Sequence, residues 1–267
     1  FRNMLNFYIE LKGEWAKAAP NLSRCAQLLD TLKLDMVRVG LSEVSSQGNL
    51  PKKQADDLIM SRELLEIAIE YSIKIGDNAA FERYMTQLKM YYYDYDKYLE
   101  SSMQMHKFMG LHLLYLLATN RIADFHIELE RLPSALLLKN VFISPVLALE
   151  NYFMEGRYNK ILQAKKSMPT ELYSNFMDLL VKTAREEIAS CMEKSYGKMS
   201  QKQAAMRLGL RVGAPELTNL AAKRNWTLDA DGNYNYAELN ARQRERVPAN
   251  DIAVHTLTYA HELEKIV

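Results

Sequence analysis

The stretch from residue 61 to residue 88, SRELLEIAIEYSIKIGDNAAFERYMTQL, decides the fold class. Apolar residues recur in its first half with the helical period, in a stripe of Leu64, Leu65, Ala68, Ile69 and Ile73. Charged residues lie largely off that stripe: Glu63, Glu66, Glu70 and Lys74. Gly76-Asp77 then joins a helix-terminating glycine to a residue suited to start the next helix. A second amphipathic helix follows, marked by Phe81, Tyr84, Met85 and Leu88. The stretch therefore predicts a helical hairpin.

The same kind of turn recurs further along the chain. Asn120-Arg121 precedes Phe125, and Gly156-Arg157 precedes Ile161, with the offset that separates Gly76 from Phe81. Glycine and asparagine tolerate the left-handed backbone that ends a helix. The steps of 44 and 36 residues lie within the range of helical-hairpin repeats. We predict a mainly α fold with stacked helical hairpins over residues 1–168, each burying its apolar face on its neighbours. An irregular helical domain is the alternative.

Composition agrees with a helical, globular chain. In 267 residues there are only 10 glycines and 7 prolines, which disfavours a sandwich or barrel with many turns. The net charge of +1 gives no whole-protein attraction to nucleic acid or to an anionic membrane. Cys25 and Cys191 are too few for a disulfide framework and are not spaced as a zinc site. A reducing compartment is the better expectation.

Neither a membrane span nor a signal peptide is expected. The longest apolar stretch, residues 110–118, is interrupted by His112 and is much shorter than the roughly 20 residues that a span needs. Residues 1–10 lack a basic start that leads into an apolar run.

The pattern changes after about residue 200. Two short helices are expected at 201–208 and 215–224, followed by a hairpin whose strands are Trp226–Leu228 and Tyr234–Tyr236. Helix, helix and hairpin in this order predict a winged helix, which with its leading helix occupies 169–246. We expect Trp226 beneath the sheet. We expect Tyr234 and Tyr236 on an exposed strand edge that binds a partner.

A final helix is expected at residues 250–267, within a segment 247–267. Its apolar residues are spaced 4-3-4-3, which is typical of a narrow seam that faces another helix. The partner-binding residues expected there are Ile252, Thr256, Leu257, Tyr259, Leu263, Ile266 and Val267. Packing of this helix on the chain's own repeats is the alternative.

The sequence carries no recognisable catalytic pattern. The sequence lacks GxxxxGK[ST], GxGxxG, GxSxG and HExxH. His126 and Glu130 could supply two ligands from one helical turn, but they do not complete a metal site, so a paired surface histidine is expected. The aromatic run Tyr91–Tyr95 contains Asp94 and is followed by Asp96. These acidic residues favour packing of the aromatic rings within the repeat over stacking on the bases of a nucleic acid. We therefore expect no catalytic residue, no metal and no cofactor.

Several segments resemble the proteasome non-ATPase regulatory subunit 8 family. They are YYYDY at 91–95, MHKFMGLHLLYLLATNRIADFHIELERLP at 105–133, YFMEGRYNKIL at 152–162, LLVKTAREEIASCMEKSY at 179–196, AAKRNWTL at 221–228 and YAHELEKIV at 259–267. The resemblance runs from about residue 58 to the end and is most specific in the central and final segments.

The resemblance implies the architecture of PCI proteins, which the proteasome lid, the signalosome and a translation initiation factor complex share. It implies helical repeats, a winged helix that associates with neighbouring subunits, and a C-terminal helix that joins a bundle. The implied function is that of a non-catalytic scaffold in the lid of the 26S regulatory particle, in cytoplasm and nucleus. Its expected partners are other lid subunits, with no small-molecule substrate, nucleic acid or membrane. The alternatives are a PCI subunit of the other two complexes, or a winged-helix nucleic-acid adaptor.

Overall fold

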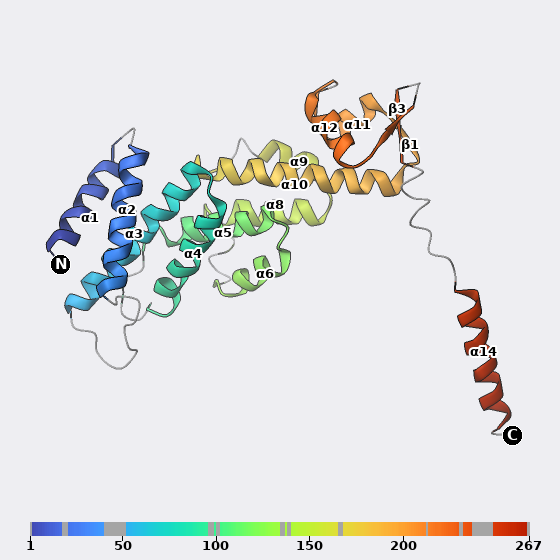
Figure 1. Ribbon diagram of the computed structural model, residues 1–267, viewed down its shortest axis with the longest axis horizontal. Helices are drawn as coiled ribbons and strands as arrows, with labels where there is room; N and C mark the ends of the chain where they lie inside the picture. Colours follow the sequence, from blue (N-terminus) through green and yellow to red (C-terminus); the bar gives the residue numbers. More distant parts are fainter. Residues whose placement is uncertain are drawn as a thin grey trace. The chain divides into compact units, whose positions relative to one another are not determined.

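The chain is mainly helical, as predicted (Figure 1). The computed structural model describes residues 2–17, 21–39, 52–95, 99, 102–133, 137, 140–164, 168–211, 213–229, 232–236 and 248–265. The helices are α1 (Arg2–Trp15), α2 (Leu22–Val39), α3 (Lys52–Ile75), α4 (Asn78–Tyr93), α5 (Met105–Ala118), α6 (Ile122–Glu130), α8 (Ser144–Met154), α9 (Tyr158–Ala164), α10 (Leu172–Ser195), α11 (Gln201–Arg207), α12 (Pro215–Lys223) and α14 (Ala249–Glu264). The strands are β1 (Lys198–Ser200), β2 (Thr227–Leu228) and β3 (Asn233–Asn235).

The chain divides within α10 into two compact units, Phe1–Ala184 and Arg185–Val267. In the first unit, consecutive helices pack in pairs: α1 with α2, α3 with α4, α5 with α6, and α8 with α9. Contacts of α2 with α3 and of α5 with α8 connect these pairs. The first unit is therefore a series of helical hairpins. The predicted division into 1–168, 169–246 and 247–267 stays a prediction about separate functional parts.

The three predicted turns share one hydrogen-bonded geometry. Gly76, Asn120 and Gly156 have φ angles of 84°, 59° and 70°, in the left-handed region. In each turn the residue that follows donates its backbone N–H to a carbonyl five residues earlier, at 2.8 to 3.0 Å. This is the Schellman arrangement, which satisfies carbonyls that would otherwise be orphaned at the helix end. The apolar residues that lie five positions after these three turn residues, Phe81, Phe125 and Ile161, are buried.

Helix α3 is buried on two sides. Leu65, Ile69 and Ile73 pack into the main core of the first unit, whereas Leu64 and Ala68 pack with residues of α1 and α2. The face expected to be polar is therefore only partly exposed, and Glu66 on that face is buried. Helix α3 packs on two sides because it lies inside the stack of helices, with helices on both sides of it.

The second unit contains the predicted helix, helix and hairpin. Strands β2 and β3 pair antiparallel, with Leu228 opposite Tyr234. One expectation is corrected: β1 pairs with the other side of β3, with Met199 opposite Tyr234, so β3 is the central strand of an order β1-β3-β2 and not an edge. The edges are β1 and β2. Strand β1 has only three residues and closely follows the long helix α10. So short a segment does not show the alternation of apolar and polar residues that predicts a strand, and β1 could therefore not be predicted.

Two of the predicted partner-binding residues, Ile266 and Val267, lie outside the residues that the structure describes.

Candidate partner-binding surfaces

An aromatic cluster fixes the sheet of the second unit. Trp226 is buried, as predicted, and its ring centroid lies 5.4 Å from that of Tyr234 and 5.2 Å from that of Tyr236. Its indole Nε1–H donates to Glu193 Oε1 on α10 at 2.7 Å. Arg224 also contacts the Glu193 carboxylate, at 3.2 Å. The cluster therefore anchors the hairpin to α10 through both apolar packing and a charge-assisted hydrogen bond.

Tyr234 and Tyr236 do not lie on an exposed edge. Tyr234 lies in β3 and Tyr236 directly follows it, and the side chains of both are buried against Trp226. Burial also raises the pKa of the Tyr236 hydroxyl to about 12. The exposed positions are on the edge strands: Thr227 and Leu228 on β2, and Lys198 on β1. The sequence of one short strand does not indicate which of its two faces the helices cover.

Helix α14 forms where the final helix was predicted, and none of its described residues is buried. Leu257 and Tyr259 are 70% and 68% exposed, and Ile252 and Leu263 are about half exposed. The Thr256 hydroxyl donates to the carbonyl of Ile252 at 3.0 Å, so its polar group is satisfied within the helix. The apolar residues of α14 are therefore not covered by the other residues that the structure describes in the second unit. Packing of this helix on the repeats of the first unit stays the alternative.

The apolar surface of α14 is wider than a single seam. At about 100° per residue, Ile252, Thr256, Tyr259 and Leu263 lie in one narrow stripe. Leu257 lies well to one side of that stripe. A broad apolar face suits contact with more than one helix, as in a bundle, better than contact with a single partner helix.

Catalytic chemistry is not evident in the part of the chain that the structure describes. There, no three His, Cys, Asp or Glu side chains lie where they could hold a metal ion. His126 Nε2 lies 3.7 Å from Glu150 Oε1, so it is the paired surface histidine that was predicted. His112 is buried in α5. Burial, with the nearby positive charges of Lys89 and Arg121, lowers its pKa to about 3.

Among the described residues, no helix combines the length and the apolar character that crossing a bilayer requires.

Known proteins match the chain over nearly its whole length. Residues 103–245 match the family model described as the CSN8/PSMD8/EIF3K family. The 26S proteasome non-ATPase regulatory subunit 8 homolog A of Arabidopsis thaliana is 37% identical over 94% of both chains. The 26S proteasome non-ATPase regulatory subunit 8 of Caenorhabditis elegans is 31% identical over 96% of this chain and 97% of its own. The 26S proteasome regulatory subunit rpn12 of Schizosaccharomyces pombe is 31% identical over 83% of this chain and 78% of its own.

Proposed function

The chain belongs to the CSN8/PSMD8/EIF3K family, and on this basis we propose that it is a non-catalytic structural and assembly subunit of the lid of the 26S proteasome regulatory particle. The observation that carries the proposal is the near full-length similarity to regulatory subunits of the 26S proteasome, at 31–37% identity in three organisms. The chain would support ubiquitin-dependent degradation through protein–protein contacts, in cytoplasm and nucleus.

Helix α14 is the main docking element in this proposal. Its apolar residues are solvent-exposed, and covering each large one contributes up to about 1.5–3 kcal/mol before the entropic cost of association is subtracted. Isolated helices of this length are marginal in water, so docking would also stabilise the helix itself. The contact residues are Ile252, Thr256, Leu257, Tyr259 and Leu263, with Ile266 and Val267 as expected neighbours.

The sheet of the second unit is the second docking element. Strands β1 and β2 are edges, and edge strands present backbone groups that a neighbouring chain can pair or cover. Leu228 adds an exposed apolar side chain on β2. In this arrangement Tyr234 and Tyr236 act from inside, by holding the central strand against Trp226, and not by touching the partner.

Truncation before residue 250 tests the docking role of α14. Because no described residue of this helix is buried in the second unit, we expect the truncated protein to keep its melting temperature within a few degrees and to fail to enter the lid. A large fall in melting temperature would indicate internal packing instead. Normal melting together with normal assembly would contradict a docking role.

A matched pair of substitutions refines this test. Tyr259→Asp places a charge in the apolar stripe, whereas Thr258→Asp places the same charge about 100° away on the helix. Both positions are exposed, so neither change should unfold the chain. We expect Tyr259→Asp to weaken co-assembly strongly and Thr258→Asp to leave it nearly unchanged. Equal effects would contradict a face-specific contact.

A further inference from the structure

Basic residues gather in one stretch of the second unit. Residues 194–215 contain no aspartate or glutamate and five basic residues: Lys194, Lys198, Lys202, Arg207 and Arg211. The whole chain has a net charge of +1, so the remaining residues together carry −4. The near-neutral total therefore conceals a local positive charge, which attracts acidic groups that approach within about a Debye length, ~10 Å.

The cations of this unit differ in whether they are paired. Those of α10, α12 and β1 form ion pairs at 2.7 to 3.2 Å: Arg185 with Glu216, Lys223 with Glu186, Arg224 with Glu193, and Lys198 with Asp229. In contrast, no carboxylate of the residues that the structure describes forms an ion pair with Lys202 or Arg207, which lie on α11. The charges of α11 are therefore available to a partner.

Helix α11 places these two cations around an exposed apolar side chain. At about 100° per residue, Lys202, Met206, Gln203 and Arg207 follow one another within an arc of about 140°. All four are exposed, whereas the other side of the helix is buried at Ala204 and Ala205. Met206 is 82% exposed, which is unusual for a large apolar side chain. The arc thus combines positive charge at both margins with apolar surface between them.

Tyr196 extends this face and orients one of its cations. The Arg207 guanidinium carbon lies 5.5 Å from the centroid of the Tyr196 ring, and Tyr196 is partly exposed. Such a cation–π contact holds the guanidinium without neutralising its charge, so less side-chain entropy is lost when a partner binds. Tyrosine, methionine and arginine are also residue types that protein interfaces favour.

The structure favours an acidic protein segment over nucleic acid as the partner. In a helix-turn-helix, the second helix enters the major groove of DNA. Here that helix is α12, and Lys223 and Arg224 at its end are already paired with glutamates. A phosphate backbone would meet the cations of α11 but would not cover Met206, whereas a peptide can place an apolar side chain there.

We propose that the α11 face, formed by Tyr196, Lys202, Met206 and Arg207, binds a partner segment in which carboxylates lie on both sides of an apolar side chain. The carboxylates meet the two cations, and the apolar side chain packs on Met206. This contact is additional to α14 and to the sheet edges, and it does not depend on the proposed function.

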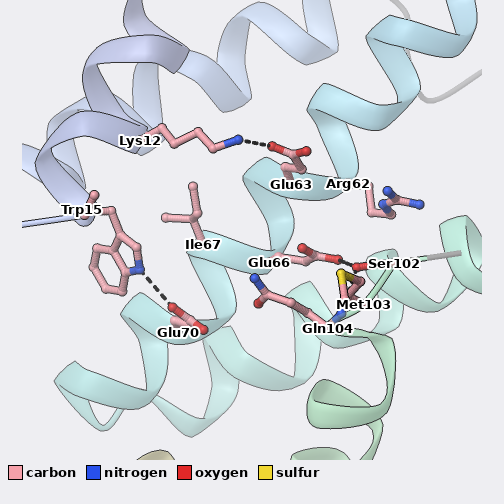
Figure 2. Close-up of a pocket in the computed structure, with 11 residues that line it drawn as sticks. Lys12, Trp15, Arg62, Glu63, Glu66, Ile67, Glu70, Ser102, Met103 and Gln104 are labelled. Carbon is pink, nitrogen blue, oxygen red and sulfur yellow. Dashed lines mark hydrogen bonds and ion pairs between the residues drawn. The ribbon is translucent and has the colours of Figure 1, made fainter. Parts of the chain in front are cut away.

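Three peptides test the inference on the full chain. Acetyl-Glu-Asp-Leu-Asp-Glu-amide carries the proposed pattern, a second peptide has serine in place of leucine, and a third has glutamine and asparagine in place of the acids. Binding is followed by NMR through the methyl signal of Met206, which is identified by its loss in Met206→Leu. Met103 is 97% exposed in the first unit, beside Ser102 and Gln104 (Figure 2), and its methyl signal is the internal control.

We expect a saturable shift of the Met206 signal with the leucine peptide, and no shift of the Met103 signal. The serine peptide and the neutral peptide should each bind about fivefold more weakly or worse, because each lacks one of the two contributions. Arg207→Glu should weaken binding of the leucine peptide about tenfold, since it replaces an attraction by a repulsion. Arg83→Glu makes the same charge change at an exposed arginine of the first unit and should alter binding less than about twofold.

Three results would overturn the inference. They are the absence of a saturable Met206 shift at about 10 mM peptide, equal affinity for the leucine and serine peptides, and equal effects of Arg207→Glu and Arg83→Glu. Tighter binding of an oligothymidylate of about ten nucleotides than of the leucine peptide, with the same loss in Arg207→Glu, would overturn it in favour of a nucleic-acid surface.

Discussion

Replacing Gly110 by alanine tests the packing of the first unit at its tightest point. Gly110 lies in α5, most of which is buried. A Cβ atom built there would lie 2.4 Å from the Tyr173 hydroxyl oxygen and 2.8 Å from the backbone carbonyl oxygen of Phe142. Both distances are below van der Waals contact, so α5, the residue 142 backbone or Tyr173 must move.

The expected magnitude follows from opposing contributions. Alanine is favoured over glycine inside a helix by about 1 kcal/mol. Forcing a methyl group into a packed core costs about 1–3 kcal/mol. The Tyr173 hydroxyl also donates to the carbonyls of Lys107 at 3.3 Å and Phe142 at 3.4 Å, and losing such a bond costs about 0.5–1.5 kcal/mol. The net expectation is a destabilisation of about 1–3 kcal/mol.

Gly13→Ala is the matched control. Gly13 lies in α1, and a Cβ atom there would meet nothing within 4 Å, so the substitution should stabilise the chain by about 0.5–1 kcal/mol. Urea unfolding followed by circular dichroism measures both variants against the unaltered chain. If Gly110→Ala proved as stable as Gly13→Ala, the close approach of α5 to Tyr173 and residue 142 would be refuted.

Two further predictions concern single buried groups. Trp226→Ala should lower the free energy of unfolding of the second unit by about 3–5 kcal/mol, and Trp226→Phe by less because it retains the ring contacts, as measured by urea unfolding. An equal loss in both variants would contradict the packing argument. The pKa of His112 is about 3 in the folded chain, whereas an unperturbed histidine in the unfolded chain has a pKa of about 6.5. As the pH falls below about 6.5, this histidine is therefore protonated in the unfolded chain but not in the folded one, and the free energy of unfolding decreases. Between pH 7 and 5.5 we expect the free energy of unfolding, measured with urea, to fall by about 1 kcal/mol, and we expect His112→Phe to lack this fall. The same pH dependence in that variant would contradict a neutral, buried His112.

The helix ends of the first unit were predictable because their signals are local. Each turn is specified by a short local pattern: a glycine or asparagine, then a polar residue, and an apolar residue at a fixed distance after the glycine or asparagine. The turns at Gly76, Asn120 and Gly156 accordingly have the predicted positions. The same hydrogen-bonded helix ending recurs in the second unit at Gly209 and Asn225.

Features that depend on distant parts of the chain were not predictable. Strand β1 depends on a partner far along the sequence, since Lys198 pairs with Asn235, and this pairing makes β3 the central strand. Glu66 was expected on a polar face, but its burial follows from Tyr92 and Ser102, which belong to later segments. The exposed apolar face of α14 was predictable in its pattern, since the pattern lies within one helix.

The identity of the proteins that co-purify with the full chain tests the central claim most directly. The tagged chain would be expressed in the cells that encode it, purified gently and analysed by mass spectrometry, beside the chain truncated before residue 250. We expect subunits of the 26S proteasome regulatory particle with the full chain, and their loss on truncation. Recovery of signalosome or translation initiation factor subunits in their place would contradict the account.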